Sequence, residues 1–66
     1  MLVVVNRREE NLPEDISLAE FIGSKGLEPG EFIFILNEFV IEREQVGSIV
    51  LKENDRLEVL RFVGGG

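Results

Sequence analysis

The sequence of 66 residues contains no cysteine, histidine, tyrosine or tryptophan. It has no threonine either, so its hydroxyl side chains are limited to Ser17, Ser24 and Ser48. The lack of cysteine excludes disulfides and thiolate metal sites, and the lack of histidine removes the most common transition-metal ligand. A nucleophile paired with a general base cannot be assembled from the remaining side chains. We therefore expect a protein that is not an enzyme and that binds no metal or cofactor of its own.

Long apolar segments and an excess of basic residues are also missing. No apolar run approaches the roughly 20 residues that a membrane-spanning helix needs, and no signal-peptide pattern opens the sequence. Seven Lys and Arg against thirteen Asp and Glu give a formal net charge of −6. An acidic protein is repelled by nucleic-acid phosphates and by anionic membrane surfaces. We expect a cytoplasmic protein that binds other proteins rather than nucleic acid or membranes.

Apolar residues, 44% of the sequence, gather in short segments typical of strands. Residues 2–5, 32–36, 39–41 and 57–63 are rich in Val, Ile, Leu and Phe, and a weaker, polar strand is expected at 9–12 after a turn at 6–8. Asn37 and Glu38 are expected to form a tight hairpin turn. Asn tolerates a positive φ but Glu does not, so two outcomes stay open: a type I′ turn strained at Glu38, or a different turn. Residues 42–50 are expected to form a loop with a short helical turn.

One helix is indicated between residues 18 and 25. Ser17 and Glu20 have the spacing of a capping box, in which each side chain binds the other residue's backbone N–H at the start of a helix. Gly26 can adopt the left-handed conformation that commonly ends a helix. The apolar residues at i, i+3 and i+4 are Leu18, Phe21 and Ile22, and this stripe is expected to pack on a sheet.

The predicted order is two strands, a helix and three further strands. Two hairpins flanking one amphipathic helix are most simply packed as a mixed sheet of four to five strands with the helix across one face. This is the α+β arrangement called the β-grasp, or ubiquitin-like, fold. Its first and last strands lie side by side and parallel at the centre, joined by a crossover that contains the helix. We expect residues 1–63 to form this domain and residues 64–66 to form a flexible tail.

The last three residues, Gly64, Gly65 and Gly66, directly follow the final strand. Glycines have no side chain to bury and the greatest backbone freedom to lose, so they are expected to project as a thin arm. Such an arm offers one reactive group, the ionised main-chain carboxylate of Gly66, which can attack the α-phosphorus of ATP. The alternative interpretation is an ordinary frayed terminus or a linker.

Side-chain parity divides the final strand between two faces of the sheet. Leu57, Val59 and Val63 point one way and are the better candidates for the core. Leu60 and Phe62 point the other way and would be partly exposed next to the tail. An exposed apolar pair beside a reactive terminus suits a docking surface, although either side chain could instead fill a gap under a loop.

These residues resemble the ThiS family of ubiquitin-fold sulfur carriers of thiamin biosynthesis. The resemblance covers nearly the whole chain, through residues 3–6, 17–21, 36–37 with 40, 43–44, 55–59 and 62–66. Two positions depart from the family pattern, because Glu38 and Asn54 stand where glycine is usual. Both changes affect turn geometry rather than the tail.

The resemblance implies that Gly66 is adenylated by an E1-like, ThiF-type enzyme using ATP and is then converted to a thiocarboxylate. Thiazole synthase, of the ThiG type, would take the sulfur, and a cysteine desulfurase is a candidate sulfur donor. Gly64 and Gly65 would thread the partner active sites, and Leu60, Phe62 and Val63 would form the nearby interface.

Two other kinds of function remain open at this stage. A related carrier could supply sulfur for molybdopterin synthesis or tRNA thiolation, since these proteins share the activated carboxylate. A non-covalent β-grasp binding module is the alternative from a different class, and its tail would have no chemical role.

Overall fold

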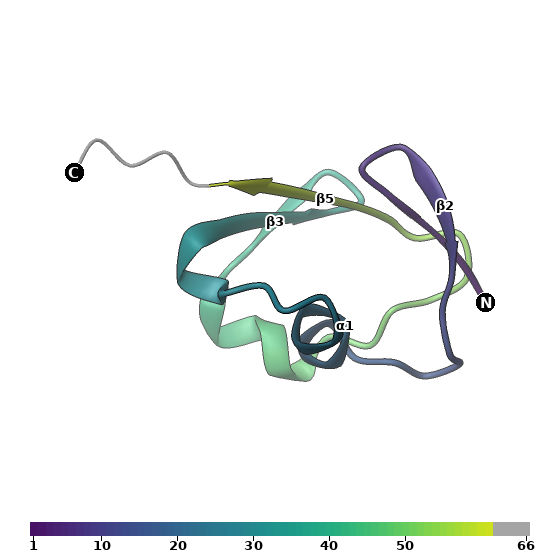
Figure 1. Cartoon of the computed structure of the whole chain (residues 1–66), viewed down its shortest axis with the longest axis horizontal. Coiled ribbons are helices and arrows are strands. Elements are labelled where there is room, and N and C mark those ends of the chain that lie inside the picture. Colours follow the sequence, from purple (N-terminus) through teal and green to yellow (C-terminus); the bar gives the residue numbers. More distant parts are fainter. Residues whose placement is uncertain (62–66) are drawn as a thin grey trace.

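The computed structural model describes residues 1–61, and their fold is a mixed five-stranded sheet with one helix across one face (Figure 1). The strands are β1 (Leu2–Val5), β2 (Arg8–Asn11), β3 (Phe32–Leu36), β4 (Phe39–Ile41) and β5 (Arg56–Arg61), and the helix is α1 (Leu18–Ser24). Two 3₁₀ helices, η1 (Pro29–Glu31) and η2 (Arg43–Ser48), complete the set. The strand order is β2-β1-β5-β3-β4, with β1 parallel to β5 and the other pairs antiparallel. The predicted β-grasp fold is confirmed.

Helix α1 begins where the capping box predicts. The Ser17 hydroxyl accepts a hydrogen bond from the Glu20 N–H at 3.0 Å, and the Ser17 N–H donates to Glu20 Oε1 at 2.9 Å. The helix ends at Ser24, one residue before the predicted limit, with Gly26 in the left-handed conformation at φ 69°. Leu27 N–H then donates to the Ile22 carbonyl at 3.1 Å, the closing bond of a Schellman motif.

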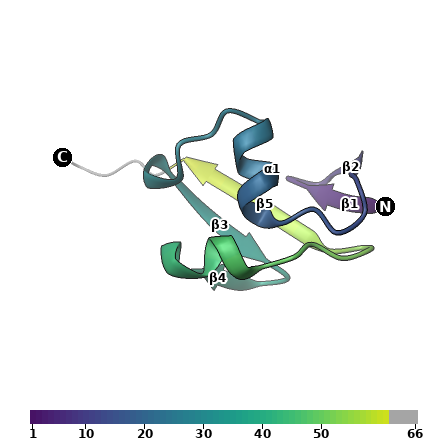
Figure 2. The same ribbon diagram turned by 90° about the horizontal axis from the view of Figure 1, so that it is seen from below.

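The core lies between α1 and the sheet. Figure 2, seen from below, shows the helix crossing in front of β5. Leu18, Phe21 and Ile22 from the helix are each at most 3% exposed. The other buried side chains come from four places in the chain: Val3, Val5, Phe34, Leu51 and Leu57. Within residues 1–61 no polar or charged residue is buried, so apolar packing supplies the core of this small domain. No helix of this part of the chain has the length and apolar character needed to cross a membrane.

Both hairpins turn through two residues with positive φ. Asn6 and Arg7 have φ values of 49° and 69°, and Asn37 and Glu38 have φ values of 49° and 75°. Two-residue loops with positive φ at both positions match the right-handed twist of the strands they join. Of the two outcomes that the sequence left open, the structure has the two-residue turn with the strained conformation at Glu38, and not a different turn. Asn54, at the other position where the ThiS pattern has glycine, also has a positive φ, 69°.

Several element limits differ from the sequence-based prediction by one residue. Strand β2 spans Arg8–Asn11 rather than 9–12, because Val5 pairs directly with Arg8 across the two-residue turn. Strand β5 begins at Arg56, since the Asn37 side chain and backbone bind that residue. The expected helical turn in 42–50 is the 3₁₀ helix η2. The predicted boundary between a domain at 1–63 and a tail at 64–66 lies outside the described residues.

Candidate functional site

Strand β5 is the central strand of the sheet and the last one before the glycines. It is held at its start by the second hairpin turn and by the turn that precedes it. The Arg56 N–H donates to Asn37 Oδ1 at 2.9 Å, and the Asn37 N–H donates to the Arg56 carbonyl at 2.7 Å. Asn37 Nδ2 also donates to Asp55 Oδ1 at 2.9 Å, while Asp55 Oδ2 accepts from the Lys52 N–H at 2.7 Å. These bonds fix the register of β5 against β3.

The first hairpin turn holds β5 from the opposite side. The Asn6 N–H donates to the Leu57 carbonyl at 2.9 Å, and Asn6 Oδ1 accepts from the Val59 N–H at 2.8 Å. The side-chain oxygen occupies the place that a backbone carbonyl would fill in a parallel ladder. Asn6 therefore extends the pairing of β1 with β5 by one hydrogen bond after the chain has turned away.

The sheet face away from α1 carries a group of apolar side chains. Leu60 is 45% exposed and pairs with Ile33, while Val40 is 61% exposed and pairs with Ile35. Residues that are directly opposite each other in a sheet share a face, and residues two apart along one strand share it too. We define the open apolar face as Ile33, Ile35, Val40 and Leu60 together with Val4 of β1.

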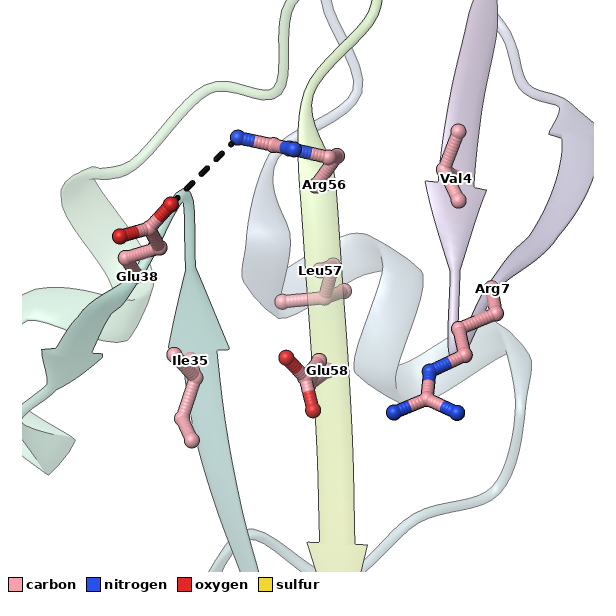
Figure 3. A pocket seen from close by; sticks show the side chains of 7 residues that line it. All are labelled: Val4, Arg7, Ile35, Glu38, Arg56, Leu57 and Glu58. Carbon is pink, nitrogen blue, oxygen red and sulfur yellow. Dashed lines mark ion pairs between the residues drawn. The ribbon is translucent and has the colours of Figure 1, made fainter.

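Charged side chains surround a shallow hollow at one end of this face. Its lining includes Arg7, Glu38, Arg56 and Glu58 together with Val4, Ile35 and Leu57 (Figure 3). Arg56 Nη2 lies 3.6 Å from Glu38 Oε2, and Arg7 extends from the first hairpin turn on the other side of β5. Exposed ion pairs of this kind add little stability. Both signs of charge are thus available here for polar contacts at the rim of an apolar surface.

The described part of the chain offers a contact surface and no constellation of reactive side chains. Among residues 1–61 no three His, Cys, Asp or Glu side chains are grouped so that they could hold a metal ion. The groups gathered beside β5 are carboxylates, guanidinium groups and amides without a hydroxyl, thiol or imidazole nucleophile.

Leu60 is the one predicted site residue that the structure describes. It points away from the core and is partly exposed, as parity along the strand predicts. Phe62, Val63, Gly64, Gly65 and Gly66 lie outside the described residues. The sequence analysis missed Val40, although parity carried across the 36–39 hairpin would have placed it beside Ile35 on the same face as Leu60.

The parallel central pair, the single helix and the open apolar face together define a small ubiquitin-like domain of the β-grasp class. The chain belongs to the ThiS family, whose family model matches residues 2–66. Members of this family are small sulfur carriers rather than enzymes.

Solved structures of thiamine biosynthesis proteins have the same fold. The crystal structure of thiamine biosynthesis protein ThiS from Geobacter metallireducens is 28% identical, with full coverage of both chains and a TM-score of 0.88. A solution structure of a thiamine biosynthesis protein from the same organism is 29% identical, covering all of this chain and 88% of the other, with a TM-score of 0.80.

Two curated relatives carry the name thiazole synthase. The protein from Magnetococcus marinus is 30% identical over 66 residues, and that from Paramagnetospirillum magneticum is 23% identical over 66 residues. All of this chain is covered in both comparisons, but it spans only 20% of the length of each relative.

Proposed function

We propose that this chain is a sulfur carrier for thiazole formation in thiamin biosynthesis, with the carboxylate of Gly66 as the group that carries sulfur. The observation that supports this most directly is the family match, which extends through the last glycine. Residues 1–63 would act as the recognition domain and residues 64–66 as the arm that enters partner active sites.

The chemistry requires two steps on Gly66, an adenylyl transfer to its carboxylate followed by an acyl transfer to sulfur. In the first, a carboxylate oxygen attacks the α-phosphorus of ATP, pyrophosphate leaves and an acyl adenylate forms. In the second, a sulfide-level nucleophile attacks the carbonyl carbon and AMP leaves, which produces the thiocarboxylate. A ThiF-type enzyme would bind the ATP, and a cysteine desulfurase would supply the sulfur as a persulfide, because the carrier has no side chain suited to either task. A thiol reductant would release this sulfur at the sulfide level and would itself be oxidised to a disulfide.

Thiazole synthase is the proposed acceptor of the sulfur. The support comes from the two relatives of that name, in each of which a segment similar to this whole chain makes up a fifth of the protein. A carrier and the enzyme it serves gain a high effective concentration when they share one polypeptide.

The proposed docking surface is the open apolar face together with the residues that follow it. Leu60 would contact the partner enzymes directly, and Phe62 and Val63 would continue the interface toward the glycines. Exposed apolar side chains add to affinity when they become buried in the centre of an interface. Gly64 and Gly65 would thread the narrow entrance to each active site, where a side chain could not pass.

The first test is the intact mass of the chain after incubation with ATP, a ThiF-type enzyme and a sulfide source. We expect a mass gain that corresponds to replacement of one carboxylate oxygen by sulfur, and no gain in a variant that lacks Gly66. Addition of thiazole synthase and its other substrates should return the mass to its starting value. The absence of any gain with several activating enzymes that modify their own carriers would favour the non-covalent binding module instead. Sulfur transfer to a molybdopterin synthase subunit, without transfer to thiazole synthase, would reassign the pathway.

A further inference from the structure

On the side of the sheet where β1 lies, β5 extends further than β1 does. The register of β1 with β5 ends at Val5 and Leu57, and the Asn6 side chain adds one further bond, to Val59. The chain then turns into β2, which lies outside β1 in the sheet. Figure 3 shows β5 running on past the end of β1. The last part of β5 is therefore an edge on this side, although its first part is in the centre of the sheet.

The backbone groups on this edge can be assigned from the hydrogen bonds already described. The Leu57 carbonyl and the Val59 N–H face Asn6, whereas the Arg56 carbonyl faces Asn37 and β3. Backbone groups of alternate residues in a strand point to the same side. The Val59 carbonyl and the Arg61 N–H therefore point toward the missing neighbour, and no hydrogen bond to either group is found within residues 1–61.

A groove lies next to this edge on the helix side of the sheet. Its apolar lining is formed by Val5, Phe21, Leu27, Phe32 and Val59. Its polar lining includes Glu10 of β2 and Lys25 at the end of α1, which form an ion pair at 2.9 Å. An extended segment added beside β5 would direct alternate side chains toward this groove.

We propose that an extended segment of thiazole synthase pairs with residues 59–61 of β5 and inserts an apolar side chain into the groove. The segment accepts a hydrogen bond from the Arg61 N–H and donates one to the Val59 carbonyl. Unpaired strand edges beside apolar side-chain sites are recognised in this way by strand addition. This inference rests on the proposed function for the identity of the partner.

Thiazole synthase is favoured as the source of this segment for two reasons. The curated relatives named thiazole synthase contain a segment similar to this chain within the same polypeptide. Residues 59–61 also come directly before 62–66 in the sequence, so a strand paired with them would bind the chain five residues before Gly66. A nucleic acid or an anionic lipid surface does not suit a chain with a net charge of −6.

The test compares Arg61→Pro with Arg61→Ala. Both changes remove the side chain that lies over the Phe32 ring and within 3.4 Å of Glu31, but only proline removes the N–H. Proline is tolerated on a strand edge, and it requires an extended residue before it, as Leu60 is. Arg61→Pro should bind the thiazole synthase of the same organism at least tenfold more weakly than Arg61→Ala by calorimetry, while both variants melt at similar temperatures.

Equal affinities of the two variants would overturn the strand pairing and leave the proposed function intact. Failure of the unmodified chain to bind thiazole synthase would overturn both. If Arg61→Pro does not fold, amide hydrogen exchange of the unmodified chain decides instead: the Arg61 N–H should exchange at least tenfold more slowly in the complex. An unchanged rate, or protection by the activating enzyme without protection by thiazole synthase, would contradict the proposal.

Discussion

Glu38, like Arg7 in the other hairpin, has a backbone conformation poorly suited to its side chain. Its φ of 75° lies in the left-handed region, which costs a non-glycine residue about 1–2 kcal/mol, and it lacks the local hydrogen bonding that lets asparagine adopt this region. Its ion pair with Arg56 is long and exposed. The conformation is imposed by the two-residue connection between β3 and β4 rather than by any contact of Glu38 itself.

Replacement of Glu38 by glycine should therefore stabilise the fold. Relief of the strain exceeds the extra unfolded-state entropy of glycine, so we expect the free energy of unfolding to rise by about 0.5–1 kcal/mol. Urea denaturation followed by circular dichroism measures this change. Glu44→Gly is the matched control, because Glu44 lies in η2 at negative φ and its loss should lower stability. A lower midpoint for Glu38→Gly would show that the turn is not strained.

At the scale of elements, the position of β5 depends on the two hairpin turns as well as on its neighbouring strands. Asn6 and Asn37 each place a side-chain oxygen on a backbone N–H of β5, at 2.8 Å and 2.9 Å. Each also adopts a positive φ, so one residue type meets both requirements at each turn. A glycine would adopt the positive φ of the turn, but it has no side-chain oxygen to accept the hydrogen bond from β5.

Asn6→Gly should loosen the end of the β1 and β5 pairing. It keeps the backbone conformation and removes the acceptor of the Val59 N–H, a bond with a net value of about 0.5–1.5 kcal/mol. We expect the Val59 amide to exchange up to about tenfold faster by NMR-detected hydrogen exchange. Asn6→Asp, which keeps a side-chain oxygen at this place, should preserve most of the protection. Equal exchange in the two variants would mean that the Asn6 side chain does not hold β5.

The elements were predictable from the sequence where their signals are local. The capping box of Ser17 and Glu20 set the start of α1, and alternation along 57–61 set the face of Leu60 correctly. The strain at Glu38 was also visible, since a two-residue turn constrains φ at that residue directly. What could not be predicted depends on distant residues: the bond from Val59 to Asn6 joins residues 53 apart, and nothing near either one indicates it.

The candidate site followed the same rule. Leu60 was found from its own strand, and parity across the hairpin of β3 and β4 would have placed Val40 beside Ile35. That Val40 and Leu60 share one face depends on the pairing of β3 with β5, which joins distant parts of the sequence. The unpaired edge at residues 59–61 could not be foreseen, because it depends on the register at which β1 ends beside β5.

At the scale of the whole molecule, the two faces of the sheet have separate tasks. One face packs on α1 and carries the stability of the domain, while the open apolar face contributes little to the core and is available to partners. Substitutions on the open face should therefore affect binding more than folding.

Leu60→Glu is expected to test this separation. It should reduce affinity for thiazole synthase and for the activating enzyme by at least tenfold, with a small change in melting temperature, because Leu60 is 45% exposed and outside the core. Val50→Glu is a matched control, since Val50 is 47% exposed and lies in the segment after η2, where it forms a bridge with Ser17 and is not part of the open apolar face. Surface plasmon resonance with each immobilised enzyme measures the effect. Equal losses for both variants would indicate a general effect of charge rather than a localised interface.

The central place of β5 also has a consequence for protein synthesis. A ribosome makes β1 first and β5 last, yet these two strands lie side by side, and β5 separates β1 from β3 in the sheet. A nascent chain that ends before residue 56 has two hairpins and a helix but no strand to join them. Long-range pairing of this kind forms late, after the costly closure of most of the chain. Folding is thus delayed until the segment next to the glycines has been made, so a nascent chain that ends before β5 presents neither the complete sheet nor the open apolar face.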